Sequence, residues 1–204
     1  LSSKEKSVVI HVGKKTKCDT PCPILQVHEN VMHEADSVKY LGNIVTPTGG
    51  LSETIDDRRN KGWGKLSEIS AILSELPDKR QLEIGLKLRD TKLHNGILFN
   101  SEAWSSTPDK LMKRLEQVDV AALKALVAGH SKCPTAFYFL EYGTLMVRHK
   151  VMVKRLMYHH HILSREDDEL VKKVYNKQKE DTTKGDWIET VREDFLFIGV
   201  IMDE

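Results

Sequence analysis

A short segment that breaks regular structure, Pro47-Thr48-Gly49-Gly50, divides the chain into two parts with different side-chain periodicities. Before it, Val8, Ile10 and Val12 recur every second residue, which predicts a strand over 7–12. After it, apolar residues recur at spacings of three and four, which indicates helices. Strands followed by helices predict an α+β fold.

The first part is expected to form a small antiparallel sheet. Residues 24–28 and 31–33 have the composition of strands and lie on either side of Glu29-Asn30, which predicts a hairpin. Residues 39–45 predict a further strand that ends at the break. Pro21 and Pro23 place the segment before the hairpin in a loop, because proline cannot sit inside a central strand.

Helices are expected throughout the second part. The first begins near Ser52, a suitable N-cap followed by acidic residues; its inner stripe comprises Ile55, Arg59, Gly62, Leu66, Ile69 and Leu73. The second restarts at Pro77-Asp78, where Asp78 and Gln81 resemble a capping box; its stripe comprises Leu82, Leu86, Leu93 and Ile97.

Proline and glycine separate the remaining helices. Thr107-Pro108-Asp109 opens a third helix with proline at the first position, and Gly129 ends it. Its inner face comprises Leu111, Leu115, Val118 and Ala122. Further helices are expected over 134–141, 147–163, 167–179 and 186–196.

Composition limits the class of protein. The 204 residues are 40% hydrophobic and 30% charged, which is typical of an ordered chain. No apolar run approaches the roughly 18 residues that a membrane span needs. Three cysteines are too few for a disulfide framework and indicate a reducing compartment, so we expect an intracellular protein, nuclear or cytoplasmic. The start, Leu1-Ser2, has no initiator methionine and no signal core, which suggests a fragment.

Charge is distributed unevenly along the chain. Residues 1–165 hold 25 Lys and Arg against 18 Asp and Glu, a balance of +7, whereas residues 166–204 hold 6 against 12, a balance of −6. A basic body with an acidic tail indicates a surface for a polyanion in the first part. An unevenly charged, solvated surface explains the charge equally well.

Several motifs occur in a fixed order: Lys6-Ser7 before a strand, Val38-Lys39-Tyr40-Leu41-Gly42, Asn100-Ser101-Glu102-Ala103-Trp104, and the run from Lys154 to Arg165. In this order they resemble the C-terminal part of a non-LTR (LINE-like) retrotransposon reverse transcriptase. The resemblance implies three segments: the end of the palm over 1–50, a thumb-like helical bundle over 51–130, and a helical region beyond the thumb over 131–204.

The parent activity that the resemblance implies is RNA-directed DNA polymerisation. The parent would use two Mg²⁺ ions held by carboxylates of a Tyr-x-Asp-Asp turn, and this chain contains no such turn. We therefore expect it to position the duplex of RNA template and DNA primer, with no cofactor of its own, no small-molecule substrate and no membrane. A non-catalytic helical protein-interaction module derived from such an element is the alternative.

The resemblance also assigns candidate contacts. Lys6 would lie near the phosphates of the incoming nucleotide, and Tyr40, Leu41 and Gly42 against the primer terminus. Glu102 is expected to cap or to form an ion pair, and Trp104 to anchor the core. The cations expected to contact nucleic acid are Arg58, Lys61 and Lys65, on one flank of the first helix, and Arg148, Lys154 and Arg155.

Metal sites are not expected. Cys18, Cys22, His28 and His33 have spacings too short for a zinc finger. His159-His160-His161 would point in three directions about 100° apart on a helix. Asp167-Asp168-Glu169 opens a helix, where the helix dipole favours acids.

Overall fold

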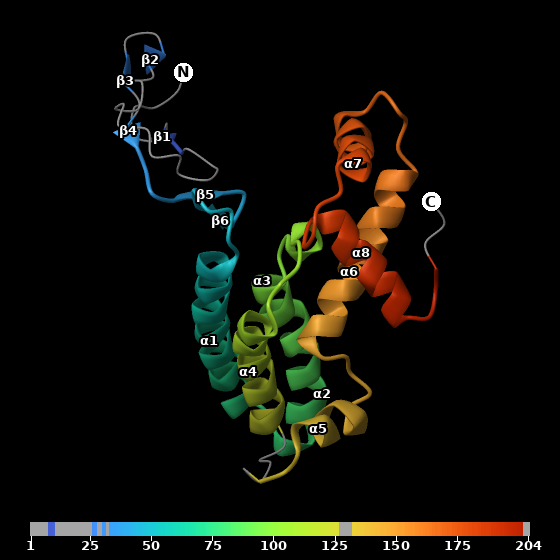
Figure 1. Cartoon of the computed structure of the whole chain (residues 1–204). Coiled ribbons are helices and arrows are strands. Elements are labelled where there is room, and N and C mark those ends of the chain that lie inside the picture. The colour runs from blue at the N-terminus through green and yellow to red at the C-terminus, as the bar shows by residue number, and fades with distance from the viewer. Residues whose placement is uncertain (1–7, 11–25, 28–29, 32, 127–131, 202–204) are drawn as a thin grey trace. The chain divides into compact units, whose positions relative to one another are not determined.

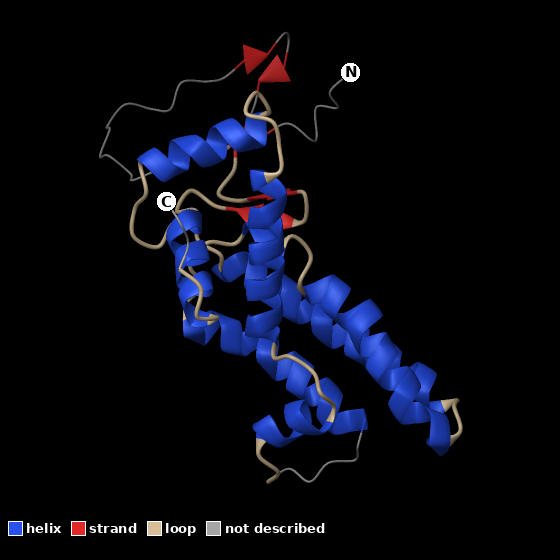
Figure 2. Cartoon of the chain, turned by 90° about the vertical axis from the view of Figure 1, so that its right-hand side faces the viewer, coloured by secondary structure: helices blue, strands red, loops and turns tan. Residues whose placement is uncertain are grey.

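The computed structural model describes residues 8–10, 26–27, 30–31, 33–126 and 132–201 (Figure 1). The chain divides into two compact units, Leu1–Thr54 and Ile55–Glu204. Helices make up most of the described residues (Figure 2) and are accompanied by short strand pairs, so the predicted α+β class is confirmed at that level. The division into three segments at 50 and 130 stays a prediction.

The first unit contains three pairs of short strands. β2 (Gln26–Val27) pairs antiparallel with β3 (Asn30–Val31), which confirms the expected hairpin. β1 (Val8–Val9) pairs with β4 (His33–Glu34) in parallel, so the prediction of a purely antiparallel sheet was wrong.

The third strand pair corrects a second prediction. One strand was expected over 39–45. Instead, β5 (Val38–Tyr40) and β6 (Asn43–Val45) form a hairpin whose loop has two residues. Thr54 holds this hairpin to the start of the first helix: Ile44 N–H donates to its hydroxyl at 2.9 Å, and the hydroxyl lies 3.2 Å from the Ile44 carbonyl.

Every helix expected after the break is present. They are α1 (Ser52–Ser74), α2 (Asp78–Leu88), the π-helix η2 (Arg89–His94), α3 (Asn95–Ile97), the 3-10 helix η3 (Ser101–Ala103), α4 (Asp109–Leu126), α5 (Thr135–Glu141), α6 (Val147–Leu163), α7 (Leu170–Glu180) and α8 (Trp187–Phe197). The expected end of α4 at Gly129 lies outside the described residues. None of the described helices is long and apolar enough to cross a membrane.

Two local predictions in this part were wrong. Pro77 stands at the N-cap of α2, and the Gln81 side chain donates to the Leu76 carbonyl at 3.0 Å instead of closing a capping box. On α1, Arg58 is buried and Arg59 is only partly buried, the reverse of the predicted stripe. The buried residues of α1 are Thr54, Ile55, Arg58, Gly62 and Ile69, and the last four recur at spacings of three, four and seven.

Glycines allow the helices of the second unit to approach closely. A Cβ atom on Gly62 of α1 would lie 2.8 Å from Ile97 Cγ2 and 3.1 Å from Val118 Cγ1, closer than carbon atoms pack. Gly85 of α2 is likewise covered by Leu126 of α4. A side chain at either position would push two helices apart. Gly64, two residues after Gly62, faces open space.

The C-terminal helices form their own part of the core. Ile162, Tyr175, Trp187, Ile188 and Val191 pack together from α6, α7 and α8. Asp186 caps α8 by accepting a hydrogen bond from the Glu189 N–H at 2.8 Å. Three helices are therefore fixed around one aromatic cluster.

Candidate nucleic-acid interface

The turn at Tyr40-Leu41-Gly42 displays apolar side chains. Leu41 and Gly42 both have positive φ, at 46° and 83°, as a type I′ hairpin turn requires. Leucine is rare in this conformation, which costs an L-residue roughly 1–2 kcal/mol. Tyr40 is 65% exposed and Leu41 70%. The hairpin thus holds an aromatic ring and an aliphatic side chain outward at an energetic cost.

Arg58 does not lie on the exposed flank where it was expected. Only 5% of its surface is exposed. Its Nη1 donates to the Gly96 carbonyl at 3.4 Å, and its guanidinium lies 5.3 Å from the centre of the Phe99 ring. Burial lowers its pKa. Arg58 is a contact between α1 and the segment after η2, and we remove it from the candidate interface.

Lys61 and Lys65 do lie at the surface of α1, each with 42% of its side chain exposed. Lys61 Nζ is 2.5 Å from Asp57, and Lys65 Nζ is 3.0 Å from Glu68. Lys92 of η2 approaches the same Glu68 at 4.0 Å. Surface pairs of this kind are weak and screened by salt, so these ammonium groups can exchange a carboxylate for a phosphate.

The two arginines expected to contact nucleic acid from α6 both form ion pairs within the protein. Arg148 binds Glu116 through Nε at 2.6 Å and through Nη2 at 2.8 Å, which raises its pKa. Arg155 is buried and binds Asp194 at 2.6 Å and the Trp104 carbonyl at 2.8 Å. Arg155 follows Val151 by four residues and therefore lies on the buried face of α6.

Lys154 makes a similar internal contact. Its Nζ donates to the Leu98 carbonyl at 2.9 Å and lies 3.2 Å from Glu102. This ion pair confirms the role expected for Glu102, and Trp104 is a buried core anchor as predicted. The prediction that α6 extends a nucleic-acid track stays untested, but these cations are all engaged within the protein.

Two motifs of the resemblance, Asn100–Trp104 and the start of the Lys154–Arg165 run, contact each other. The segment from Asn100 to Trp104 begins with a left-handed residue, Asn100, at φ 58°. Besides Lys154 and Arg155, it contacts the start of α8, where Trp187 Nε1 donates to the Glu102 carbonyl at 2.8 Å. Residues 51 and 85 positions further along the chain thus converge on one short loop.

Sequence analysis missed a buried charged network centred on Asp119 of α4. Arg89 donates to both of its carboxylate oxygens at 2.7 Å, and His94 Nε2 donates to one of them at 2.7 Å. On its other side, His94 Nδ1 lies 2.9 Å from Asp90 and 2.8 Å from Lys150 Nζ. The signal was present: Arg89 stands three residues after Leu86 and four before Leu93, on the inner stripe.

This network stabilises the packing of η2 against α4. Burial alone would raise the pKa of Asp119, but the hydrogen bonds from His94 and Arg89 outweigh it and hold the pKa below its usual value. Arg89 and His94 belong to the π-helix η2, where the backbone is locally widened. Because the Asp119 carboxylate accepts three hydrogen bonds from them, it fixes the position of α4 against η2.

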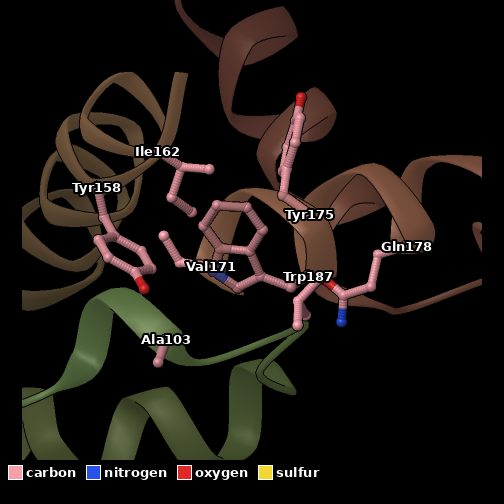
Figure 3. A pocket seen from close by; sticks show the side chains of 8 residues that line it. Ala103, Tyr158, Ile162, Val171, Tyr175, Gln178 and Trp187 are labelled. Carbon is pink, nitrogen blue, oxygen red and sulfur yellow. The ribbon is translucent and has the colours of Figure 1, made fainter. Parts of the chain in front are cut away.

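Two hollows lie beside these elements. One, of about 260 Å³, is lined by residues of η2, α3 and α6 that include His94, Lys150 and Lys154. The other, also about 260 Å³, is lined by aromatic and aliphatic side chains of α6, α7 and α8 (Figure 3).

Metal-binding groups of three or more His, Cys, Asp or Glu residues are not found in the described part of the chain. Cys18, Cys22 and His28 lie outside it, as does Lys6. Of the three consecutive histidines, His159 is buried and pairs with the Tyr175 hydroxyl at 3.1 Å, whereas the other two are exposed.

Comparisons with known proteins add no assignment. No protein-family model, curated protein or solved structure matches the chain.

Proposed function

We propose that this chain is the part of a non-LTR retrotransposon reverse transcriptase that follows the catalytic turn, and that it positions a template–primer duplex without catalysing polymerisation. The Tyr40-Leu41-Gly42 hairpin carries the proposal. At the position where the resemblance places the primer terminus, a strained turn keeps Tyr40 and Leu41 exposed. A flat, exposed ring at a hairpin turn is suited to pack against a terminal base pair.

Phosphates would be bound by the α1 lysine patch, which we define as Lys61, Lys65 and Lys92. Their carboxylate partners are Glu68, with 51% of its side chain exposed, and Asp57, with 23%; salt screens the pairs with Glu68 most readily. Contacts of this type position a duplex without reading its sequence. The set differs from the sequence prediction because Arg58 is buried.

The packing of α1 and η2, which carry this patch, against α2 and α4 supports a thumb-like role. Gly62 and Gly85 bring them into close contact, and the Asp119 network ties η2 to α4. A phosphate-binding face needs such a support, because a loosely held lysine loses more side-chain and backbone freedom on binding. The absence of a Tyr-x-Asp-Asp turn from the sequence accords with a binding role.

The salt dependence of duplex binding tests the proposal. Affinity for an RNA–DNA hybrid is measured from low to moderate salt for the wild type and for a triple Lys61→Gln, Lys65→Gln, Lys92→Gln variant. Each lost phosphate contact is expected to reduce the log–log slope by about 0.9. The matched control replaces three exposed lysines, Lys79, Lys110 and Lys113, with glutamine and removes the same charge.

An unchanged slope in the patch variant, or an equal loss in the control, contradicts the proposal. Tyr40→Ala is expected to weaken binding to the hybrid while leaving the slope unchanged, because it removes a ring and no charge. A loss of slope in Tyr40→Ala would instead indicate a damaged fold.

A second candidate function, protein interaction, is favoured by one observation. Apolar side chains at the end of α8 are exposed, namely Leu196, Phe197, Ile198, Val200 and Ile201. Exposed clusters of this kind mark interaction surfaces. This function predicts salt-insensitive binding to a protein, sensitive to Phe197→Ser, and no binding to the hybrid.

A further inference from the structure

The aromatic hollow between α6, α7 and α8 is a formed site that none of the roles above uses (Figure 3). Trp187 lies at its centre, with Tyr158 on one side and Tyr175 on the other. Ile162 and Val171 complete the inner wall. The outer rim is formed by Ala103, Val174 and Gln178.

The inner rings are fixed before any ligand arrives. Trp187 donates its indole N–H to the Glu102 carbonyl, and Tyr175 pairs with His159. The Tyr158 and Trp187 rings pack edge to face, with centroids 5.8 Å apart and planes at 78°. Since the polar atoms of Trp187 and Tyr175 are already bonded, the surface left for a ligand is flat and apolar.

The rim also carries a polar side chain. Gln178 is exposed and its amide both donates and accepts hydrogen bonds. Pockets for drug-sized ligands have volumes of about 300–1,000 Å³. A hollow of about 260 Å³ accordingly suits one ring system.

The helix that forms the outer wall is basic. α7 contains four lysines and one glutamate. Its pocket face carries Val171, Val174, Tyr175 and Gln178, and helical geometry places Lys172 and Lys179 together on one flank. Acids occupy the two ends of the helix, at Glu169 and Glu180. The positive charge therefore stands beside the hollow.

We propose that this hollow binds the base of a single unpaired nucleotide, with its phosphate held by the Lys172 and Lys179 flank. The inference rests on the proposed nucleic-acid function and extends it from duplex to unpaired template. Proteins bind single strands by stacking bases on aromatic rings beside a basic surface, which is the combination found here. An aromatic side chain of a partner protein would leave the lysines without a role.

The test uses adenosine 5′-monophosphate and the NMR signal of the Trp187 indole N–H. In the wild type this signal shifts saturably with nucleotide in the millimolar range, and added salt weakens the effect. Ala103→Phe places a ring across the exposed rim and abolishes the shift. Ala136→Phe, at an exposed alanine of α5, leaves it unchanged.

Gln178→Ala guards against a folding defect, because it removes only a rim amide. It is expected to weaken nucleotide binding roughly three- to tenfold, the effect of one or two lost hydrogen bonds. No shift in the wild type, or an equal shift in Ala103→Phe, overturns the proposal. So does a shift with N-acetyl-tryptophanamide where the nucleotide gives none.

Duplex binding separates this inference from the proposed function. Ala103→Phe is expected to bind a blunt hybrid as the wild type does, and to lose only the added affinity for a single-stranded overhang. If the α1 lysine patch variant loses duplex binding but the nucleotide gives no shift at Trp187, the pocket assignment fails alone. If the nucleotide shifts Trp187 but no hybrid binds, the duplex function fails alone.

Discussion

Replacing Asp119 with alanine is expected to destabilise the second unit more than any surface substitution. The carboxylate is fully buried and accepts three hydrogen bonds of 2.7 Å, two from Arg89 and one from His94. Without it, the buried Arg89 guanidinium keeps, among the described residues, only Asp90, at 3.5 Å, as a counter-charge. Breaking a buried ion pair in this way costs about 3–5 kcal/mol.

That loss is large enough to measure by thermal unfolding. For a chain of this size each kcal/mol lowers Tm by about 2–4 °C, so Asp119→Ala should lower Tm by about 6–20 °C. The control is Glu83→Gln, which breaks the exposed pair with Lys87. It should leave Tm unchanged, because exposed pairs contribute little.

A double variant tests whether the loss of stability comes from the unpaired charge. Arg89→Met with Asp119→Leu removes both charges and fills the space, so it should recover part of the loss; His94 keeps recovery incomplete. A Tm within about 2 °C of the wild type for Asp119→Ala, well below the loss worked out above, would refute the reasoning. A double variant less stable than Asp119→Ala would do the same.

Three further predictions follow from the structure. Gly64→Ala should stabilise α1 by about 1 kcal/mol in urea unfolding, whereas Gly62→Ala should destabilise it, because its Cβ would lie 2.8 Å from the Ile97 side chain; equal signs would contradict the packing. Leu41→Asn should slow hydrogen exchange in the hairpin, since asparagine tolerates positive φ; faster exchange would contradict the strain. Burial lowers the pKa of His159, so the folded protein resists protonation of this side chain. Stability should therefore fall as pH drops below about 6.5, by at most about 1.4 kcal/mol per pH unit. In His159→Gln, the urea midpoint should change less between pH 7.5 and 5.5 than in the wild type.

The helices were predictable because their signal is local. Apolar spacing and the residues at Ser52, Pro77 and Pro108 located α1, α2 and α4 to within a few residues. The same reasoning failed between Arg58 and Arg59, because the apolar spacing of α1 does not decide which of two adjacent arginines faces the core. Arg58 is buried since the Gly96 carbonyl and the Phe99 ring receive its guanidinium, and neither partner can be identified from the pattern of α1.

Long-range pairing was out of reach for a similar reason. The sequence around Asp119 has no distinctive pattern, and its structural role depends on an ion pair with Arg89, 30 residues away. The parallel pairing of β1 with β4 likewise joins segments that no local rule connects. The turn at Leu41 was identified as important by resemblance, but its positive φ could not be read from leucine, which normally avoids that conformation.

The convergence on the Asn100–Trp104 loop limits how the protein can be dissected. A chain that ends before α8 would lack Asp194, the carboxylate partner of Arg155. It would also lack Trp187, whose indole N–H donates to the Glu102 carbonyl. Truncations that remove α8 should therefore yield aggregating or partly unfolded products, since the remaining chain keeps a desolvated guanidinium without its carboxylate. Roles within residues 55–204 have to be mapped by point substitution in the intact chain.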